Sequence, residues 1–137
     1  MILLQCTNVK LFMKYIFITG VNRGIGFFLT KELLQRGHSV IGTYRKTPDN
    51  NNLQKLKSDF PTTLNLTYLD VTAVERDELT RYLNSFKAID ILINNAGILD
   101  GGNVSFEKLQ IDDLLRSIEV NPLGPKIISQ LLLPKLS

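Results

Sequence analysis

The sequence predicts an α/β fold in three layers, in which helices cover both faces of a doubly wound parallel sheet. Two observations lead to this prediction. Short apolar runs with the length of buried strands alternate along the chain with stretches of helical spacing. A glycine cluster, TGVNRGIG at residues 19–26, lies between the first apolar run and the first helical stretch. With right-handed crossovers, the strands are expected in the order 3-2-1-4.

The first half of the chain begins this alternation with a strand at Tyr15–Thr19 and a helix from Gly24 to about Arg36. Gly37 ends the helix, as glycine often does. The apolar residues of the helix are expected to share one face, and they are Ile25, Leu29, Leu33 and Leu34. The following elements are a strand at Ser39–Tyr44, a polar loop at Thr47–Asn52, a short helix at Leu53–Ser58 and a strand at Leu64–Leu69.

The second half continues with a helix from about Ala73 to Phe86, for which Thr72 is the expected N-cap and Glu75 completes a capping box. The remaining elements are a strand at Ile89–Ile93, a loop at Gly101-Gly102, a helix near Ser105–Val120 and a helix at Pro122–Leu133. Residues 1–12 are expected to be either a loose arm or a stretch before a true start at Met13, so the folded domain is predicted at 13–137.

Composition restricts the class of protein. A chain of 137 residues with 44% hydrophobic content can form one domain around a single core. The lone Cys6 fits a reducing compartment, and the start at Met1 lacks the features of a signal peptide, so we expect a cytoplasmic protein. No apolar stretch has membrane-spanning length, and the net charge of +3 is scattered among acids. We therefore expect neither a membrane nor a nucleic acid as partner.

Four motifs together carry a resemblance to a known family. They are the glycine cluster at 19–26, Asp70-Val71 after the third strand, Asn94-Asn95-Ala96-Gly97 after the fourth strand, and Asn121 on the following helical stretch. In this order and spacing they resemble the short-chain dehydrogenase/reductase family, from about Met13 to the end of the chain. The resemblance implies a Rossmann-type sheet and an oxidoreductase that moves hydride between NAD(P) and a small carbonyl or alcohol substrate.

The family's proton-donating Tyr, with Lys four positions later, has no match in this sequence. The residues four positions after the four tyrosines are Thr19, Pro48, Thr72 and Phe86. The chain ends at Ser137, about where the family's fifth strand and its Ser begin. We therefore expect a truncated, amino-terminal cofactor-binding half that is catalytically incomplete. The alternative is a noncatalytic NADP-binding or interaction module, or the remnant of a shortened gene.

The glycine cluster is the first part of the candidate cofactor site. Gly20 allows a sharp turn off the strand, Gly24 keeps side chains away from a pyrophosphate, and Gly26 lets the helix approach the sheet. The intervening Asn22, Arg23 and Ile25 belong to the same candidate site. A glycine cluster alone also fits an ordinary turn between a strand and a helix.

The end of the second strand bears on the choice of cofactor. Enzymes of this fold that use NAD place an acid there, whereas this chain has Tyr44 followed by Arg45. Together with Arg23, Arg45 favours the additional phosphate of NADP through charge-assisted hydrogen bonds. We therefore predict NADP over NAD. Alternatively, Arg45 and Lys46 are a solvated strand end and Arg23 is a surface residue.

The resemblance also assigns roles to the later motifs. It implies that Asp70 contacts the adenine amino group while Val71 packs on the ring, although Asp70 also fits a helix-capping acid. It implies that Asn94 contacts the cofactor ribose and that Asn95 braces the central strand. Ala96 and Gly97 would be small because the cofactor passes close by. As a bare sequence, this tetrapeptide is only a turn.

The resemblance implies that Asn121 holds a proton-relay water in a complete family member, at a local break in the helix. Pro122 disfavours helical geometry at the preceding residue, which is consistent with such a break. A helix cap before Pro122 is the alternative. His38, the single histidine, is expected to be exposed and without a metal or catalytic role. Without a fifth strand, we expect self-association through the open strand edge and the last helix. The apolar residues expected to be exposed there are Ile127, Ile128, Leu131, Leu132, Leu133 and Leu136.

Overall fold

The computed structural model describes residues 12–46, 51–86, 88–100 and 104–137. Within these ranges, four parallel strands form one sheet in the order β3-β2-β1-β4, which confirms the predicted topology. The predictions for residues 1–11, including Cys6, for most of the 47–52 loop and for Gly101-Gly102 lie outside the described residues.

The strands have nearly the predicted bounds, and they are β1 (Tyr15–Thr19), β2 (Ser39–Tyr44), β3 (Leu64–Tyr68) and β4 (Ile91–Ile93). Phe17 in the centre of β1 lies opposite Ile41 of β2 and Leu92 of β4. The middle of β1 is buried from both faces, which explains why it reads as a continuous apolar run rather than an alternating one.

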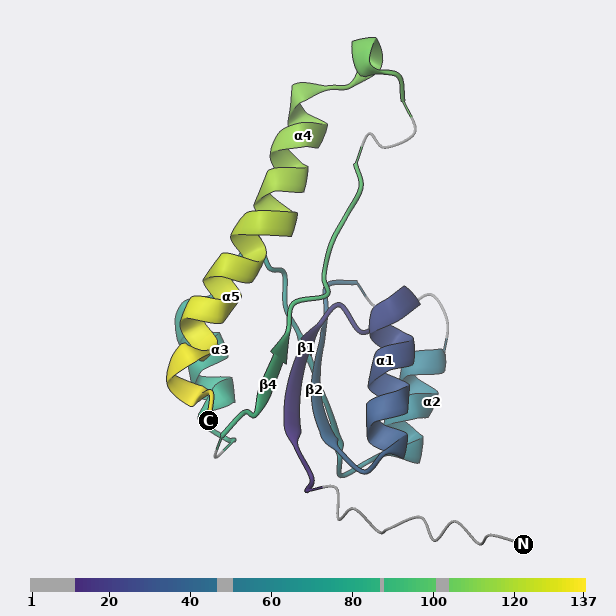
Figure 1. The fold of residues 1–137 in the computed structure, drawn as a ribbon, viewed down its shortest axis with the longest axis vertical. Helices are drawn as coiled ribbons and strands as arrows, with labels where there is room; N and C mark the ends of the chain where they lie inside the picture. Colours follow the sequence, from purple (N-terminus) through teal and green to yellow (C-terminus); the bar gives the residue numbers. More distant parts are fainter. Residues whose placement is uncertain (1–11, 47–50, 87, 101–103) are drawn as a thin grey trace, which may run out of the picture.

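Helices cover both faces of the sheet, as Figure 1 shows. On one face lie α1 (Gly24–Gln35) and α2 (Asn52–Asp59), and on the other lie α3 (Arg76–Leu83) and α5 (Gly124–Leu132). Each face has its own apolar cluster, one including Ile18, and the other including Phe17. The sheet is therefore the middle of three layers, as predicted.

The predicted apolar face of α1 is confirmed except at Ile25, which is 79% exposed. Leu34 is buried and Leu29 and Leu33 pack against the apolar cluster, and the small residues Gly26 and Thr30 also face the sheet. Thr30 keeps its hydroxyl satisfied in the core by donating to the Gly26 carbonyl oxygen at 2.8 Å. Gly26 and Thr30 are small, so α1 can lie close to the sheet with these residues at the contact, and the neighbouring Ile25 faces solvent.

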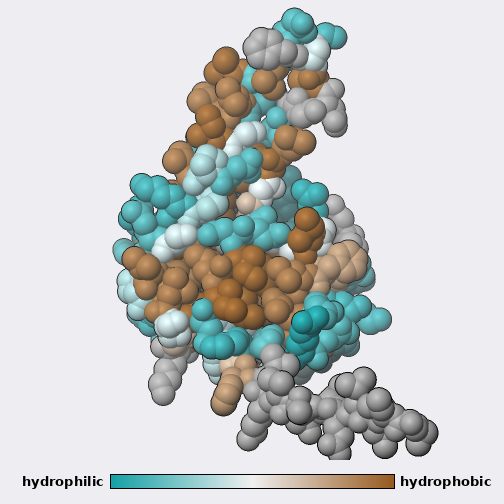
Figure 2. Space-filling view, viewed as in Figure 1, coloured by the Kyte–Doolittle hydropathy of each residue, from teal (hydrophilic) through white to brown (hydrophobic). Residues whose placement is uncertain are grey.

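The two helices predicted near residues 105–120 and at residues 122–133 together form one long, bent rod. It contains a short 3-10 turn (Phe106–Lys108), α4 (Ile111–Ile118), a turn of π-helix (Glu119–Leu123), α5 and a final 3-10 turn (Leu133–Lys135). Figure 1 shows α4 extending well beyond the sheet, and none of its residues is buried. Apolar side chains gather along α4 and in a band across the middle of the molecule (Figure 2).

Two element boundaries differ from the predictions for reasons visible in the contacts. Helix α3 begins at Arg76 with Glu75 at the N-cap position, so Thr72 lies before the helix, where its main-chain N–H and hydroxyl donate to Asp70 at 2.9 and 2.8 Å. Glu75 makes no side-chain capping hydrogen bond. Strand β4 begins at Ile91, and Ile89 instead forms an isolated parallel bridge with Leu136.

Predictions of exposure were wrong at three positions. His38 is buried, and its Nδ1 accepts a hydrogen bond from the main-chain N–H of Lys14 at 3.3 Å. Ile128 and Leu132 are fully buried, because this face of α5 packs on the sheet in the same cluster as Phe17. In the described part of the chain, no helix has both the length and the apolar character needed to cross a membrane.

Candidate functional site

A cleft of about 530 Å³ opens where the carboxyl ends of the strands meet the start of α1. It brings together most residues of the predicted cofactor site, although they come from separate parts of the chain. The predicted residues that line it are Gly20, Asn22, Arg23, Gly24, Ile25, Gly26, Arg45, Asp70, Val71, Ala96 and Gly97. Parallel sheets of this type place their ligands at this edge.

The glycine turn forms one wall of the cleft through close approach of the main chain. Gly20 has a φ of +75°, and a Cβ there would lie 3.0 Å from the Cα of Ala96. At Gly26, a Cβ would overlap the carbonyl oxygen of Gly20 and the side-chain amide of Asn95. Asn95 donates to the carbonyl oxygens of Thr19 and Gly20, at 2.9 Å each. This amide therefore joins β1 to the segment that follows β4.

The N-terminus of α1 is arranged to receive an anion. The helix begins at Gly24, directly on the cleft, and the side chain of its N-cap residue Arg23 makes no capping hydrogen bond. The first turn of α1 contains no acid. Its N–H groups and the positive end of the helix dipole therefore face the cleft. Arg23, Arg45 and Lys46 add three cationic side chains to the lining.

Part of the cleft lining is apolar. It includes Leu69, Val71, Ala96, Ile98 and Val120, which come from the ends of β3 and β4 and from the π-turn. The cleft thus combines cationic side chains and a helix N-terminus with apolar surface that suits a flat ring. An elongated ligand with negative charge and an aromatic group matches this arrangement.

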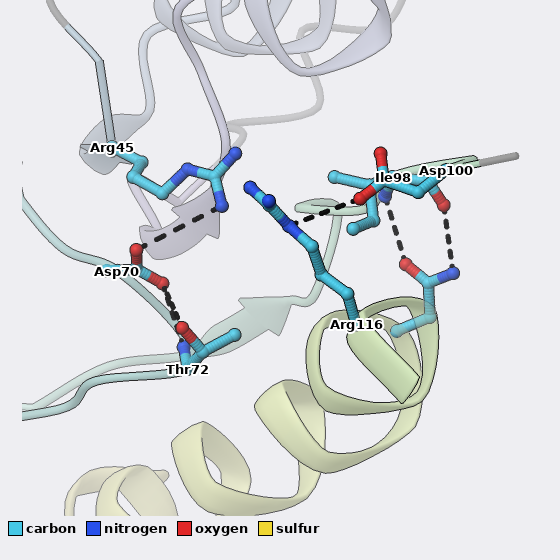
Figure 3. Close-up of polar contacts among 7 residues, drawn as sticks. Arg45, Asp70, Thr72, Ile98, Asp100 and Arg116 are labelled. Atoms are coloured by element: carbon cyan, nitrogen blue, oxygen red, sulfur yellow. Dashed lines mark hydrogen bonds and ion pairs between the residues drawn. The ribbon is translucent and has the colours of Figure 1, made fainter. Parts of the chain in front are cut away.

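Asp70 is the acid of the cleft, and Figure 3 shows its surroundings. One carboxylate oxygen accepts both hydrogen bonds from Thr72, and the other lies 4.0 Å from Nη1 of Arg45. Partial burial opposes ionisation, but the Thr72 hydrogen bonds and the charges of Arg45 and Arg116 outweigh it and hold the pKa of Asp70 below its ordinary value of 3.8. Asp70 is therefore a fixed, ionised acceptor at neutral pH.

The helix bends at Asn121, which lies in the π-turn, and the expected local break is confirmed. Its Oδ1 accepts from the main-chain N–H of Ile98 and its Nδ2 donates to the carbonyl oxygen of Ile98, both at 3.0 Å (Figure 3). The alternative of a helix cap was wrong, because the amide bonds a separate segment instead of the first turn of α5. Asn121 therefore ties the bend to the segment after β4.

Three predicted site residues lie outside the cleft lining, and they are Asn121, Tyr44 and Asn94. Tyr44 is half-buried and packs against the apolar cluster under α1 and α2, while its neighbour Arg45 reaches the cleft. Asn94 donates from its side-chain amide to the hydroxyl of Ser129 on α5, at 3.1 Å. The side chains of Tyr44 and Asn94 thus contact other parts of the protein, and their predicted roles at the cofactor stay predictions.

Sequence reasoning did not assign several of the lining residues to the site, namely Lys46, Leu69, Asn95, Ile98 and Val120. Leu69, Ile98 and Val120 read only as apolar positions, and their signal was adjacency to Asp70, Gly97 and Asn121. Among the described residues, no group of three or more His, Cys, Asp or Glu side chains is placed to hold a metal ion.

Comparison with known proteins agrees with this geometry. Residues 14–137 match the family model of short chain dehydrogenases. The chain is 33% identical over 127 residues to the oxidoreductase BOA17 of Botryotinia fuckeliana, with 88% of this chain and 43% of the relative covered. It is 32% identical over 121 residues to the NADP-dependent 3-hydroxy acid dehydrogenase YdfG of Escherichia coli O6:H1, with 87% and 47% covered.

Among solved structures, a carbonyl reductase from Pseudomonas aeruginosa PAO1 in complex with NADP superposes with a TM-score of 0.82 at 25% identity. The superposition covers 91% of this chain and 54% of that one. The chain thus spans about half the length of the relatives that it matches.

Proposed function

Because the chain belongs to the short-chain dehydrogenase/reductase family, we propose that its cleft binds NADP(H) and that the whole protein transfers hydride between NADP(H) and a carbonyl or alcohol. The observation that carries this proposal is the uncapped N-terminus of α1, which opens onto a cleft lined by Arg23, Arg45 and Lys46. A dinucleotide with an additional phosphate matches both features.

The preference for NADP rests on the end of β2. Among the described residues at the end of β2, no acid is placed to bind a ribose 2′-hydroxyl, since Tyr44 packs against the apolar cluster and Arg45 lines the cleft. A guanidinium group binds phosphate through paired, charge-assisted hydrogen bonds. The similar YdfG enzyme is an NADP-dependent dehydrogenase and the similar Pseudomonas reductase holds NADP, and both support this choice.

Each part of the cleft has a proposed role. The glycine turn and the first turn of α1 bind the pyrophosphate, since no side chain separates it from the main-chain N–H groups. Asp70 accepts a hydrogen bond from the adenine amino group, and Val71 packs on the ring. Bound NADPH supplies the hydride. Asn121 maintains the bend beside Gly97 and Ile98, next to the position expected for the nicotinamide end.

The proton for the reaction has no donor of the family type in these 137 residues, because none of the four tyrosines is followed by Lys at the fourth position. We therefore propose that this chain by itself binds NADP(H) but turns over slowly or not at all. The second candidate function, favoured by the same observation, is a noncatalytic NADP-binding or interaction module.

A titration of the purified chain with NADPH and NADH, followed by coenzyme fluorescence and calorimetry, tests the binding proposal. Tighter binding of NADPH is expected, and no heat with either coenzyme at millimolar concentration would contradict it. A turnover assay with NADPH and a panel of aldehydes and ketones separates the two candidates. Rapid, chain-dependent oxidation of NADPH would reject the noncatalytic module.

Arg45→Asp tests the cofactor preference. Loss of a charge-assisted phosphate contact is expected to weaken NADPH binding by about tenfold or more, with a much smaller effect on NADH. Arg81→Asp is the matched control, since it makes the same change of charge on α3, away from the cleft lining. An unchanged ratio of the two affinities in the Arg45 variant would count against NADP selection at this position.

A further inference from the structure

A second cavity of about 420 Å³ adjoins the cleft at its acidic end. Arg45 and Asp70 line both cavities, so their ion pair lies at the boundary between them. On the far side, the second cavity is lined by Arg116 of α4. Figure 3 shows the guanidinium groups of Arg45 and Arg116 approaching the same region from different elements.

These residues form two separate ion pairs. Arg45 lies 4.0 Å from Asp70, and Nε of Arg116 lies 3.2 Å from Asp100. Both arginines favour the ionised form of Asp70 electrostatically. Arg45 comes from the end of β2, Asp70 follows β3, Asp100 follows β4 and Arg116 belongs to α4. Asp70 therefore has two cationic neighbours, of which only Arg45 also lines the cleft.

We propose that Arg116 is a positioning residue for NADP selectivity, which holds Asp70 in place when Arg45 turns from that carboxylate to the 2′-phosphate. This inference rests on the proposed binding of NADP(H) in the cleft. With NADH, no phosphate competes for Arg45, so the guanidinium keeps its partner Asp70. With NADPH, Arg45 binds the 2′-phosphate, and Asp70 then depends on Arg116 as its counter-ion.

Two features of Arg116 suit this role. Its side chain is 56% exposed, so a substitution leaves no cavity in the core. Its partner Asp100 lies two residues after Ile98 of the cleft lining, so the ion pair joins α4 to the segment that follows β4. Surface ion pairs contribute little to stability by themselves. We therefore expect a substitution of Arg116 to have a modest effect on cofactor selectivity and little effect on folding.

The test is a comparison of NADPH and NADH affinities in the 137-residue chain and in Arg116→Gln, Arg116→Lys and the control Arg81→Gln. Arg116→Gln is expected to weaken NADPH binding about three- to fivefold and NADH binding less than about twofold. Arg116→Lys is expected to restore most of the lost affinity, and Arg81→Gln to leave both affinities unchanged. Circular dichroism and urea denaturation establish that each variant is folded.

The same measurement in the Asp70→Asn background separates action through Asp70 from a direct or long-range effect on the phosphate. There, Arg116→Gln is expected to have no selective effect on NADPH. Persistence of the selective loss in that background, or an equal loss for both coenzymes in the original background, would overturn the inference while the proposed function stands. Absence of binding of either coenzyme to the unsubstituted chain would overturn both.

Discussion

On the α1 side of the cleft, glycines allow main-chain segments to pack closely, whereas on the α4 side polar side chains hold the chain in place. The glycine wall, residues 19–26, lets main-chain segments approach so closely that a Cβ at Gly26 would overlap its neighbours. The polar wall, by which we mean Asp70 of the cleft lining and the neighbouring Asp100, Arg116 and Asn121, is held by hydrogen bonds and ion pairs. We infer that the glycine wall does not tolerate a side chain at Gly20 or Gly26 and that the polar wall can be altered in steps.

The largest expected effect is at the glycine wall. Gly26→Ala should cost about 3 kcal/mol in the free energy of unfolding, because the obstacle at this position includes a main-chain carbonyl that has no room to move. Gly24→Ala is the matched control, since a Cβ there meets nothing within 4 Å and only its φ of +57° is unfavourable, at about 1 kcal/mol. Urea denaturation followed by circular dichroism measures both variants, and equal losses would break the contrast between them.

An intermediate effect is expected at Asn121. Asn121→Ala removes two hydrogen bonds to the main chain of Ile98 and should cost about 1 kcal/mol, because the site is partly open to water. Asn121→Asp should cost more, since it places a carboxylate oxygen against the Ile98 carbonyl. Asn22→Ala is a suitable control, as its side chain makes only a long contact of 3.5 Å to Lys46. A loss no larger than in this control would show that the bend does not depend on the amide.

The smallest expected effect is a pH dependence of the free energy of unfolding, which comes from Asp70 of the polar wall and has no counterpart in the glycine wall. The folded-state pKa of Asp70 lies below its ordinary value of 3.8, so its stabilising contribution is complete above that value and is lost as the pH falls through the folded-state pKa. Stability measured from about pH 6 to pH 3 should therefore decline less steeply in Asp70→Asn, by less than about 1 kcal/mol. Parallel curves for the two proteins would contradict this assignment.

The sequence predicted the parts of the molecule that depend on local periodicity and on glycine. The bounds of β1 and β2, the start of α1 at Gly24 and the strand order were all confirmed. These features follow from short-range sterics and from the handedness of strand crossovers. The glycine turn could also be predicted from the sequence, because its geometry depends on which residues lack a side chain.

The remaining differences involve polar contacts that hydrophobic periodicity does not contain. Thr72 was predicted to cap α3, but it donates two hydrogen bonds to Asp70, two residues before it, and α3 begins only at Arg76. His38 was predicted to be exposed, but its ring accepts from Lys14, a residue far away in sequence. Arg116 showed only as one charge on an amphipathic helix, because its proximity to Asp70 depends on where the bend at Asn121 directs α4.

The crowding at Gly26 has a genetic consequence. A Cβ at position 26 would meet two groups. One is the side-chain amide of Asn95, which a second mutation to a shorter residue can remove, but the other is the carbonyl oxygen of Gly20. Every amino acid carries that oxygen, so no exchange at position 20 or 95 makes space for it. A search for suppressors of an alanine at position 26 should therefore recover true revertants and none at Asn95.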